Sequence, residues 1–216
     1  MASRDYPNDY PSVTTILGVL RKIGLEAWFK YNTPQQIKKE SDEGKLIGTQ
    51  IHEAIHDYIK TVQVKVETIH AQAVMNALKG FIQFTKDHPG YTFKNAEIPL
   101  TSETYKFNGT LDCLAEHNGL LIADWKTGKA KDKDKPDIYD EYIFQVAAYV
   151  YLYNEVNKTN IDRAFILSLA KDKVAYNFLE VTKEMIDISL SQVFFPALSI
   201  YNGQKRIKEI LKNKEV

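Results

Sequence analysis

The sequence predicts an α/β fold in which helices flank a mixed β-sheet. Residues 1–90 have the apolar spacing of helices, residues 93–126 alternate apolar and polar side chains, and a helical pattern at 140–156 precedes two more strand-like runs. The 216 residues suit one domain with a substantial core. We expect this domain over 1–216, mainly helical at 1–90, with a sheet core at 91–181 and C-terminal helices at 182–216.

The N-terminal part contains five segments with helical periodicity. Ser12 or Thr14, in the segment Pro11-Ser12-Val13-Thr14, can cap the first of them by accepting hydrogen bonds from free backbone N–H groups. His88-Pro89-Gly90 ends the last one. The segments lie near 14–22, 25–31, 34–42, 46–61 and 67–87.

The next part of the chain predicts a strand meander from Phe93 to Lys126. Its short runs are broken at Ser102, at Gly109 and at Asn118-Gly119. A polar loop at 127–138 leads to the helix at 140–156. Strands at 162–170 and 173–181 follow, and a helix of about 20 residues with a basic helical tail ends the chain.

Composition excludes several classes of protein. No apolar run approaches the ~20 residues that cross a bilayer, and the first residues lack the pattern of a secretory signal, so we expect an intracellular protein without a membrane partner. Cys113 is the only cysteine, which excludes an internal disulfide and a four-cysteine iron–sulfur cluster. The 28 basic and 28 acidic residues argue against binding nucleic acid through bulk charge.

Two acidic residues fall on neighbouring predicted strands, and the turn between the strands decides whether they meet. A two-residue turn at Asn118-Gly119 would put Asp112 and Asp124 on opposite faces of the sheet. A three-residue loop with a left-handed glycine instead pairs Glu116 with Leu120 and sets Asp112 opposite Asp124.

We prefer the three-residue loop because it gathers the polar groups on one face, including Lys126. The apolar side chains that it gathers on the other face are Leu111, Cys113 and Ala123. Two facing carboxylates repel each other unless a cation lies between them, so a hard divalent metal with oxygen and nitrogen ligands is expected. The ordinary alternative is a surface ion pair between Lys126 and one of the acids.

Four short sequence elements span residues 48–149, about half of the chain. They are Gly48-Thr-Gln-Ile-His52, Gly109-Thr-Leu-Asp112, Asp124-Trp-Lys126-Thr-Gly128 and Gln145-Val-Ala-Ala-Tyr149. In their order and spacing, these elements resemble the RecB-like nucleases of the PD-(D/E)XK superfamily, and the segment beginning at Pro11 is similar to the N-terminal segment of the phage-type and mitochondrial exonucleases of that group. The family often has Glu where this chain has Asp124, and the cysteine cluster of some relatives is absent.

This resemblance implies a restriction-endonuclease-like core and a role for each residue of the four elements. Asp112, Asp124 and Lys126 are the implied catalytic residues, and Gln145 and Tyr149 are the implied contacts with DNA. The implied metal ligands are His52, Asp112, Asp124 and the Trp125 carbonyl, and Glu97 is a further acid near them. The expected cofactor is Mg²⁺ or Mn²⁺, without an iron–sulfur cluster.

The resemblance further implies a deoxyribonuclease that hydrolyses phosphodiesters by water attack. We expect an exonuclease from a bacterium or a phage that acts on single-stranded DNA or on duplex ends in recombination, repair or replication. A recombination or replication protein could be its partner. A separate hypothesis, drawn only from the position of the helical first third, is that this part arches over the site and admits a single strand.

A competing motif begins at one of the implied ligands. His52-Glu53-Ala54-Ile55-His56 matches the H-E-x-x-H of zinc metallopeptidases, with only Glu67 or His70 nearby as a third ligand. A zinc peptidase is therefore the second hypothesis, and a weakly active DNA-binding recombination partner is the third. Packing in the core or at its rim is the ordinary alternative for Tyr149, as it is for Tyr151 and Tyr153.

Overall fold

A five-stranded mixed sheet forms the centre of the computed structural model, which describes residues 6, 8–20, 30–131 and 134–213. The strands follow the order β1-β2-β3-β4-β5, with β3 and β4 parallel and every other pair antiparallel. They are β1 (Thr92–Ser102), β2 (Phe107–Glu116), β3 (Leu120–Gly128), β4 (Ala164–Ala170) and β5 (Tyr176–Val181). The α/β class predicted from the sequence is confirmed.

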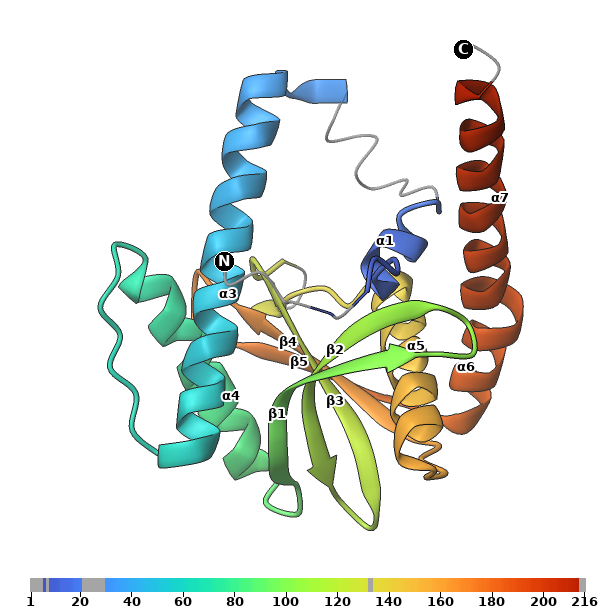
Figure 1. Ribbon diagram of the computed structural model, residues 1–216. Helices are drawn as coiled ribbons and strands as arrows, with labels where there is room; N and C mark the ends of the chain where they lie inside the picture. Colours follow the sequence, from blue (N-terminus) through green and yellow to red (C-terminus); the bar gives the residue numbers. More distant parts are fainter. Residues whose placement is uncertain (1–5, 7, 21–29, 132–133, 214–216) are drawn as a thin grey trace.

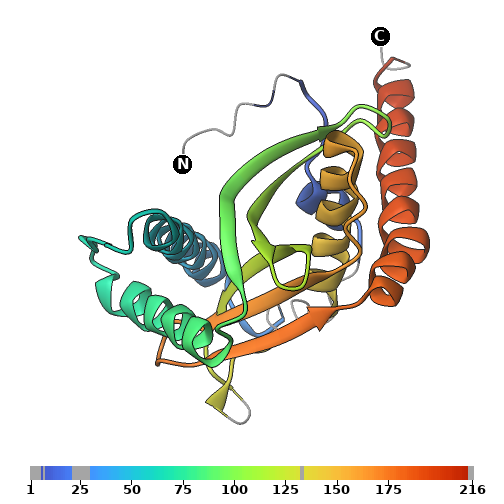
Figure 2. The same ribbon diagram turned by 90° about the horizontal axis from the view of Figure 1, so that it is seen from below.

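Helices cover both faces of this sheet (Figures 1 and 2). Helices α3 and α4 pack on one face, and the remaining helices pack on the other, with α5 directly against the strands. The helices are α1 (Val13–Leu17), α3 (Pro34–Thr61), α4 (Ala71–Asp87), α5 (Asp140–Asn157), α6 (Lys183–Ile188), the π-helical turn η2 (Ser189–Phe194) and α7 (Phe195–Lys212). No described helix is both long and apolar enough to cross a bilayer.

Two hydrophobic cores, one on each face, hold the layers together. Successive residues of β3 alternate between them, since Ile122 packs on the α5 side while Leu121 and Ala123 pack beneath α3 and α4. The rings of Phe81 and Trp125 meet edge to face at 5.3 Å in the second core. Burial of each such aromatic ring contributes about 1.5–3 kcal/mol.

Several helix boundaries differ from those expected. The segments expected at 34–42 and 46–61 form one continuous helix, α3, which begins at a capping box made by Thr33 and Gln36. Gly44 between the two segments does not end it, because one glycine costs a helix only about 1 kcal/mol. Helix α4 begins at Ala71 rather than at 67, α1 ends at Leu17, and the segment expected at 25–31 lies largely outside the described residues.

The strands also differ in detail from the expectation. Gly109 does not break the meander, because β2 begins at Phe107 and passes through it. Strands β4 and β5 start two and three residues later than expected. Leu111 packs on the α5 side rather than with Cys113 and Ala123, so this part of the predicted face was wrong.

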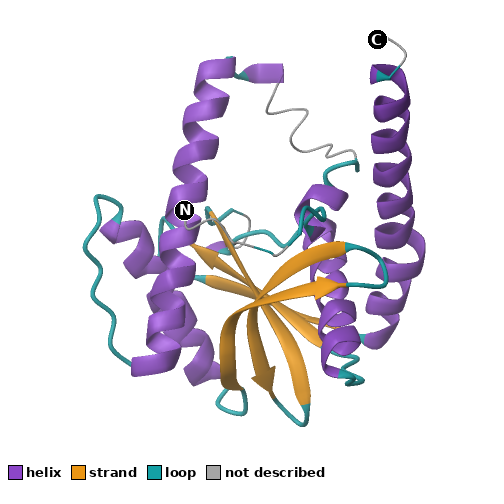
Figure 3. Ribbon diagram, in the orientation of Figure 1, coloured by secondary structure: helices purple, strands orange, loops and turns teal. Residues whose placement is uncertain are grey.

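Strands β2 and β3 pair at one end and separate at the other, as Figure 3 shows. The predicted three-residue loop is confirmed, since Glu116 pairs with Leu120 and the backbone φ of Gly119 is +114°. The register runs to Cys113 opposite Ala123 and stops there, although both strands continue.

The N-terminal segment runs along the separated half of β2. The Asn108 N–H donates to the Pro11 carbonyl at 2.9 Å, and Ser12 forms a parallel bridge with Asn108. A gap between β2 and β3 therefore opens at the level of Asp112 and Asp124, bordered by the residues that lead into α1.

Candidate active site

A pocket of about 340 Å³ occupies the gap between β2 and β3. Five predicted site residues line it: His52 from α3, Asp112 from β2, Lys126 from β3, and Gln145 and Tyr149 from α5. The four sequence elements, which are far apart in the chain, thus converge on one place.

Hydroxyl groups that the sequence did not single out as site residues line the same pocket. The Tyr6 hydroxyl hydrogen-bonds with Thr110 Oγ1 at 2.6 Å, and both residues border the pocket. Ser12 and Thr14, which were expected only as helix caps, do so as well. The sequence alone does not indicate that Tyr6 belongs to the site, because the residue with which it forms a hydrogen bond, Thr110, is 104 positions away.

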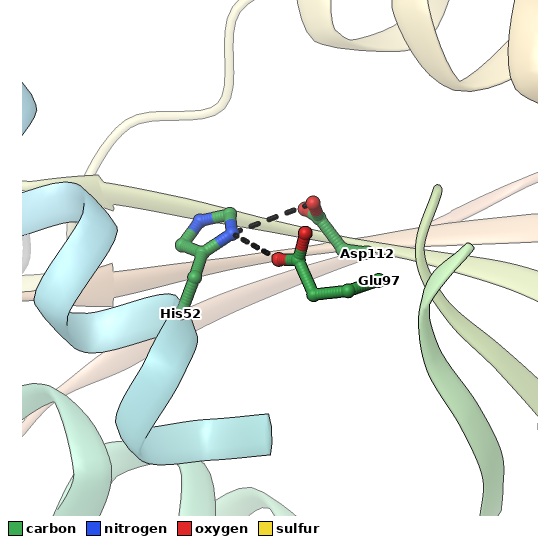
Figure 4. Close-up of side chains that lie close together, drawn as sticks. All are labelled: His52, Glu97 and Asp112. Carbon is green, nitrogen blue, oxygen red and sulfur yellow. Dashed lines mark ion pairs between the residues drawn. The ribbon is translucent and has the colours of Figure 1, made fainter. Parts of the chain in front are cut away.

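Three potential metal ligands meet beside the pocket (Figure 4). His52 Nδ1 lies 3.4 Å from Asp112 Oδ1 and 4.0 Å from Glu97 Oε1. One ligand atom from each residue lies within 4.8 Å of those of the other two. One imidazole nitrogen and two carboxylates form a donor set suited to a hard divalent cation.

Glu97 reaches this cluster through an unusual backbone conformation. Its φ is +55°, although it lies within β1, between Ala96 opposite Cys113 and Ile98 opposite Leu111. A non-glycine residue in this left-handed region costs about 1–2 kcal/mol, and such strain is concentrated at functional sites. The sequence suggested Glu97 as a further acid near the site, and the structure places its carboxylate beside His52.

Asp124 is completely buried and is not among the residues that line the pocket. Lys126 Nζ lies 2.6 Å from its Oδ2, but neither carboxylate oxygen accepts a hydrogen bond of regular geometry from the described residues. Burial and the nearby charge of Asp112 raise the pKa of Asp124 to about 7, despite the opposing effect of Lys126. An unsatisfied buried carboxylate is costly, so this arrangement fits a site that a cation completes.

Where the strands separate, the Asp112 side chain accepts a hydrogen bond in place of a backbone carbonyl. Its Oδ2 accepts a hydrogen bond of 2.8 Å from the Trp125 N–H. Burial alone would raise the pKa of Asp112, but the adjacent His52, Lys126 and this hydrogen bond together lower it. Conversely, burial alone would lower the pKa of His52, but Asp112 outweighs burial and the net direction is upward. Asp112 is therefore the carboxylate that stays ionised.

Gln145 and Tyr149 lie one turn apart on the face of α5 that borders the pocket. Gln145 Nε2 donates to the Tyr149 hydroxyl at 2.7 Å. The Tyr149 ring lies against Gly109, where an added Cβ would be 3.0 Å from the ring and 2.6 Å from Leu152 Cδ1. Gly109 therefore allows α5 to approach β2 closely enough for Tyr149 to reach the pocket.

The alternative zinc site is not assembled in the described part of the chain. The group of potential ligands that contains His52 includes two carboxylates, and neither His56, Glu67 nor His70 joins such a group there. Glu53, the general base of that hypothesis, is exposed on α3. The H-E-x-x-H match thus lacks the third ligand that a zinc peptidase requires.

Comparisons with known proteins find a matching family model and solved structures with partial similarity in fold. A family model described as the PD-(D/E)XK nuclease superfamily matches residues 26–211. No curated protein matches the chain. Among solved structures, a candidate exonuclease from Eubacterium rectale is similar in fold, with a TM-score of 0.50 and 17% identity over 74% of this chain and 68% of that one. An alkaline exonuclease from Laribacter hongkongensis has a TM-score of 0.43 and 13% identity over 77% of this chain and 84% of that one.

Substitution of Gly109 tests the close approach of α5. We expect Gly109→Ala to lower the free energy of unfolding by about 1–3 kcal/mol, because the new methyl group overlaps Leu152 and the Tyr149 ring. Urea denaturation measures the effect. Gly44→Ala in α3 is the control, because open space surrounds Gly44 and the change should stabilise the helix by about 0.5–1 kcal/mol. Equal effects at both positions would contradict the packing described.

The raised pKa of Asp124 predicts how stability depends on pH in the absence of metal. The folded protein holds a proton that the unfolded chain has released, so stability falls as pH rises from about 4 through 7. We expect about 1 kcal/mol lower stability at pH 8 than at pH 6 in EDTA, and the raised pKa of His52 acts in the same direction. Asp124→Asn should remove most of this loss. An unchanged difference between pH 6 and pH 8 in that variant would refute the assignment.

Proposed function

Because this chain belongs to the PD-(D/E)XK nuclease superfamily, we propose that it is a deoxyribonuclease dependent on Mg²⁺ or Mn²⁺. Membership of the superfamily also agrees with the restriction-endonuclease-like core expected from the sequence. The observation that carries the proposal is the convergence of His52, Glu97 and Asp112 beside a pocket that contains Lys126.

His52, Glu97 and Asp112 are the proposed metal-binding residues, with Asp124 and the Trp125 carbonyl as further ligands. When bound, the cation supplies Lewis acidity and lowers the pKa of water. The hydrogen bond from the Trp125 N–H orients the Asp112 carboxylate, and the two carboxylates of the cluster hold the imidazole of His52. Lys126 donates to the phosphate or to the attacking water and stabilises negative charge there.

DNA is the proposed substrate, and the pocket supports one strand rather than a duplex. A volume of about 340 Å³ is near the lower end for small-ligand sites, so it accommodates about one nucleotide. The amide of Gln145 can hold a phosphate oxygen, and the Tyr149 ring can stack on a base. We propose exonucleolytic action on single-stranded or end-exposed DNA, which the resemblance to end-processing relatives favours.

The metal and the catalytic lysine can be tested on end-labelled single-stranded DNA. We expect cleavage with Mg²⁺ or Mn²⁺ and none in EDTA, with a loss of about 100-fold or more in Lys126→Ala and in Asp112→Asn. His56→Ala is the matched control, and it should cleave at the wild-type rate. Full activity of Lys126→Ala, or loss of activity in His56→Ala, would contradict the proposed site. DNA binding without cleavage would instead indicate a recombination partner.

Exonucleolytic action can be tested with closed circular single strands. The proposal predicts rapid release of nucleotides from linear strands, and cleavage of circles at less than a hundredth of that rate, because circles have no end to enter the pocket. Gel electrophoresis of both substrates in one reaction gives the ratio. Comparable cleavage of circles would show an endonuclease and leave the metal-dependent chemistry standing.

A further inference from the structure

Lys126 has an aromatic neighbour that is not among the residues of the four sequence elements. Its Nζ lies 5.2 Å from the centre of the Tyr142 ring, while the same atom lies 2.6 Å from Asp124 Oδ2. The ammonium therefore has a carboxylate and the face of a ring as its neighbours. An attraction of this kind is strongest where water is excluded, and the Lys126 side chain is only 15% exposed.

The position of Tyr142 follows from the periodicity of α5. Tyr142, Gln145 and Tyr149 are spaced by three and four residues, so they lie on one face of the helix, the face that borders the pocket. Tyr142 packs at the edge of the core on this side of the sheet.

A second aromatic residue holds the Tyr142 ring in place. Tyr139 meets it edge to face, with 5.3 Å between ring centres. The Tyr139 hydroxyl donates to Asp137 Oδ2 at 3.0 Å and accepts from Lys131 Nζ at 3.0 Å. The ring facing Lys126 is thus fixed by contacts outside the pocket.

The Tyr142 ring could still attract the Lys126 ammonium if Asp124 bound a metal, whereas the Asp124 carboxylate would then no longer be available to it. A cation bound by Asp124 would compete with Lys126 for the same oxygens and would repel the ammonium. The face of a ring attracts an ammonium without accepting its N–H groups as a carboxylate oxygen does, so these donors remain available for water or phosphate. Burial is the main cause that raises the pKa of Tyr142, and the neighbouring Tyr139 and several acids, including Asp124, raise it further. The phenol therefore stays uncharged beside the lysine.

We infer that Tyr142 is the positioning residue for Lys126, holding the ammonium at the pocket through the face of its ring when Asp124 binds the metal. This inference rests on the proposed nuclease function. It assigns Tyr142 a role through Lys126 and not through contact with the substrate, so the ring is required and the hydroxyl is not.

Two substitutions at this position separate the ring from the hydroxyl. Tyr142→Leu should lower kcat about tenfold and leave the KM for single-stranded DNA within about twofold, whereas Tyr142→Phe should restore kcat to within about threefold of wild type. Tyr153→Leu on the same helix is the matched control, because it also removes a half-buried aromatic ring but should leave kcat unchanged. A loss in Tyr142→Phe as large as in Tyr142→Leu, or an unchanged kcat in Tyr142→Leu, would overturn the inference.

A second measurement tests the contact without any cleavage assay. Reductive ¹³C-methylation of the lysines gives one NMR signal set per side chain, and Lys126→Arg identifies the signals of Lys126. The ring face should shift these signals upfield in wild type and in Tyr142→Phe, and the shift should vanish in Tyr142→Leu. Signals that are the same in wild type and Tyr142→Leu would overturn the inference.

The two measurements also keep the inference apart from the function on which it rests. A wild-type protein that cleaves no DNA would contradict the nuclease, whatever the NMR signals show. A wild-type nuclease whose kcat is unchanged in Tyr142→Leu would contradict the role of Tyr142 alone.

Discussion

The rest of the site depends on one hydrogen bond, which the Trp125 N–H donates to the carboxylate of Asp112. A backbone carbonyl would ordinarily accept from this donor if the two strands continued side by side. Here the side chain satisfies it, and the strands are free to separate without leaving a buried N–H unpaired. The pocket, the N-terminal border at Asn108 and the exposure of Lys126 to the pocket follow from that separation.

The charged groups that meet at this site lower the stability of the fold. Among the described residues, buried Asp124 has an ion contact to Lys126 and accepts no hydrogen bond of regular geometry, and Glu97 adopts a left-handed backbone inside a strand. Neither feature stabilises the protein alone, since buried ion pairs and strained backbones are both expensive. Together, the two features fit a site whose electrostatics suit a cation. The two cores on either side of the sheet supply the stability.

Much of the site was predictable because its residues carry local signals. The turn at Asn118-Gly119 specifies the register from Glu116 opposite Leu120 to Cys113 opposite Ala123, but the predicted pairing of Asp112 with Asp124 does not form, because the strands separate there. The contribution of Glu97 was not predictable in the same way, because a single left-handed residue has no periodic pattern. The contact of Tyr142 with Lys126 was missed because the lysine lies on a strand distant in sequence, and a helical tyrosine packs in a core far more often than it contacts a charge.

The N-terminal border of the pocket has a consequence for how the protein acquires its site. Tyr6 and Thr110 are 104 positions apart, and Asn108 Nδ2 bonds to Asn8 across 100. Contacts of such high sequence separation form late, because the long loop between them must close first. During synthesis on the ribosome, the segment that contains Tyr6 and Asn8 therefore waits for a strand made about 100 residues later, and the pocket is completed only when the two ends of that loop dock.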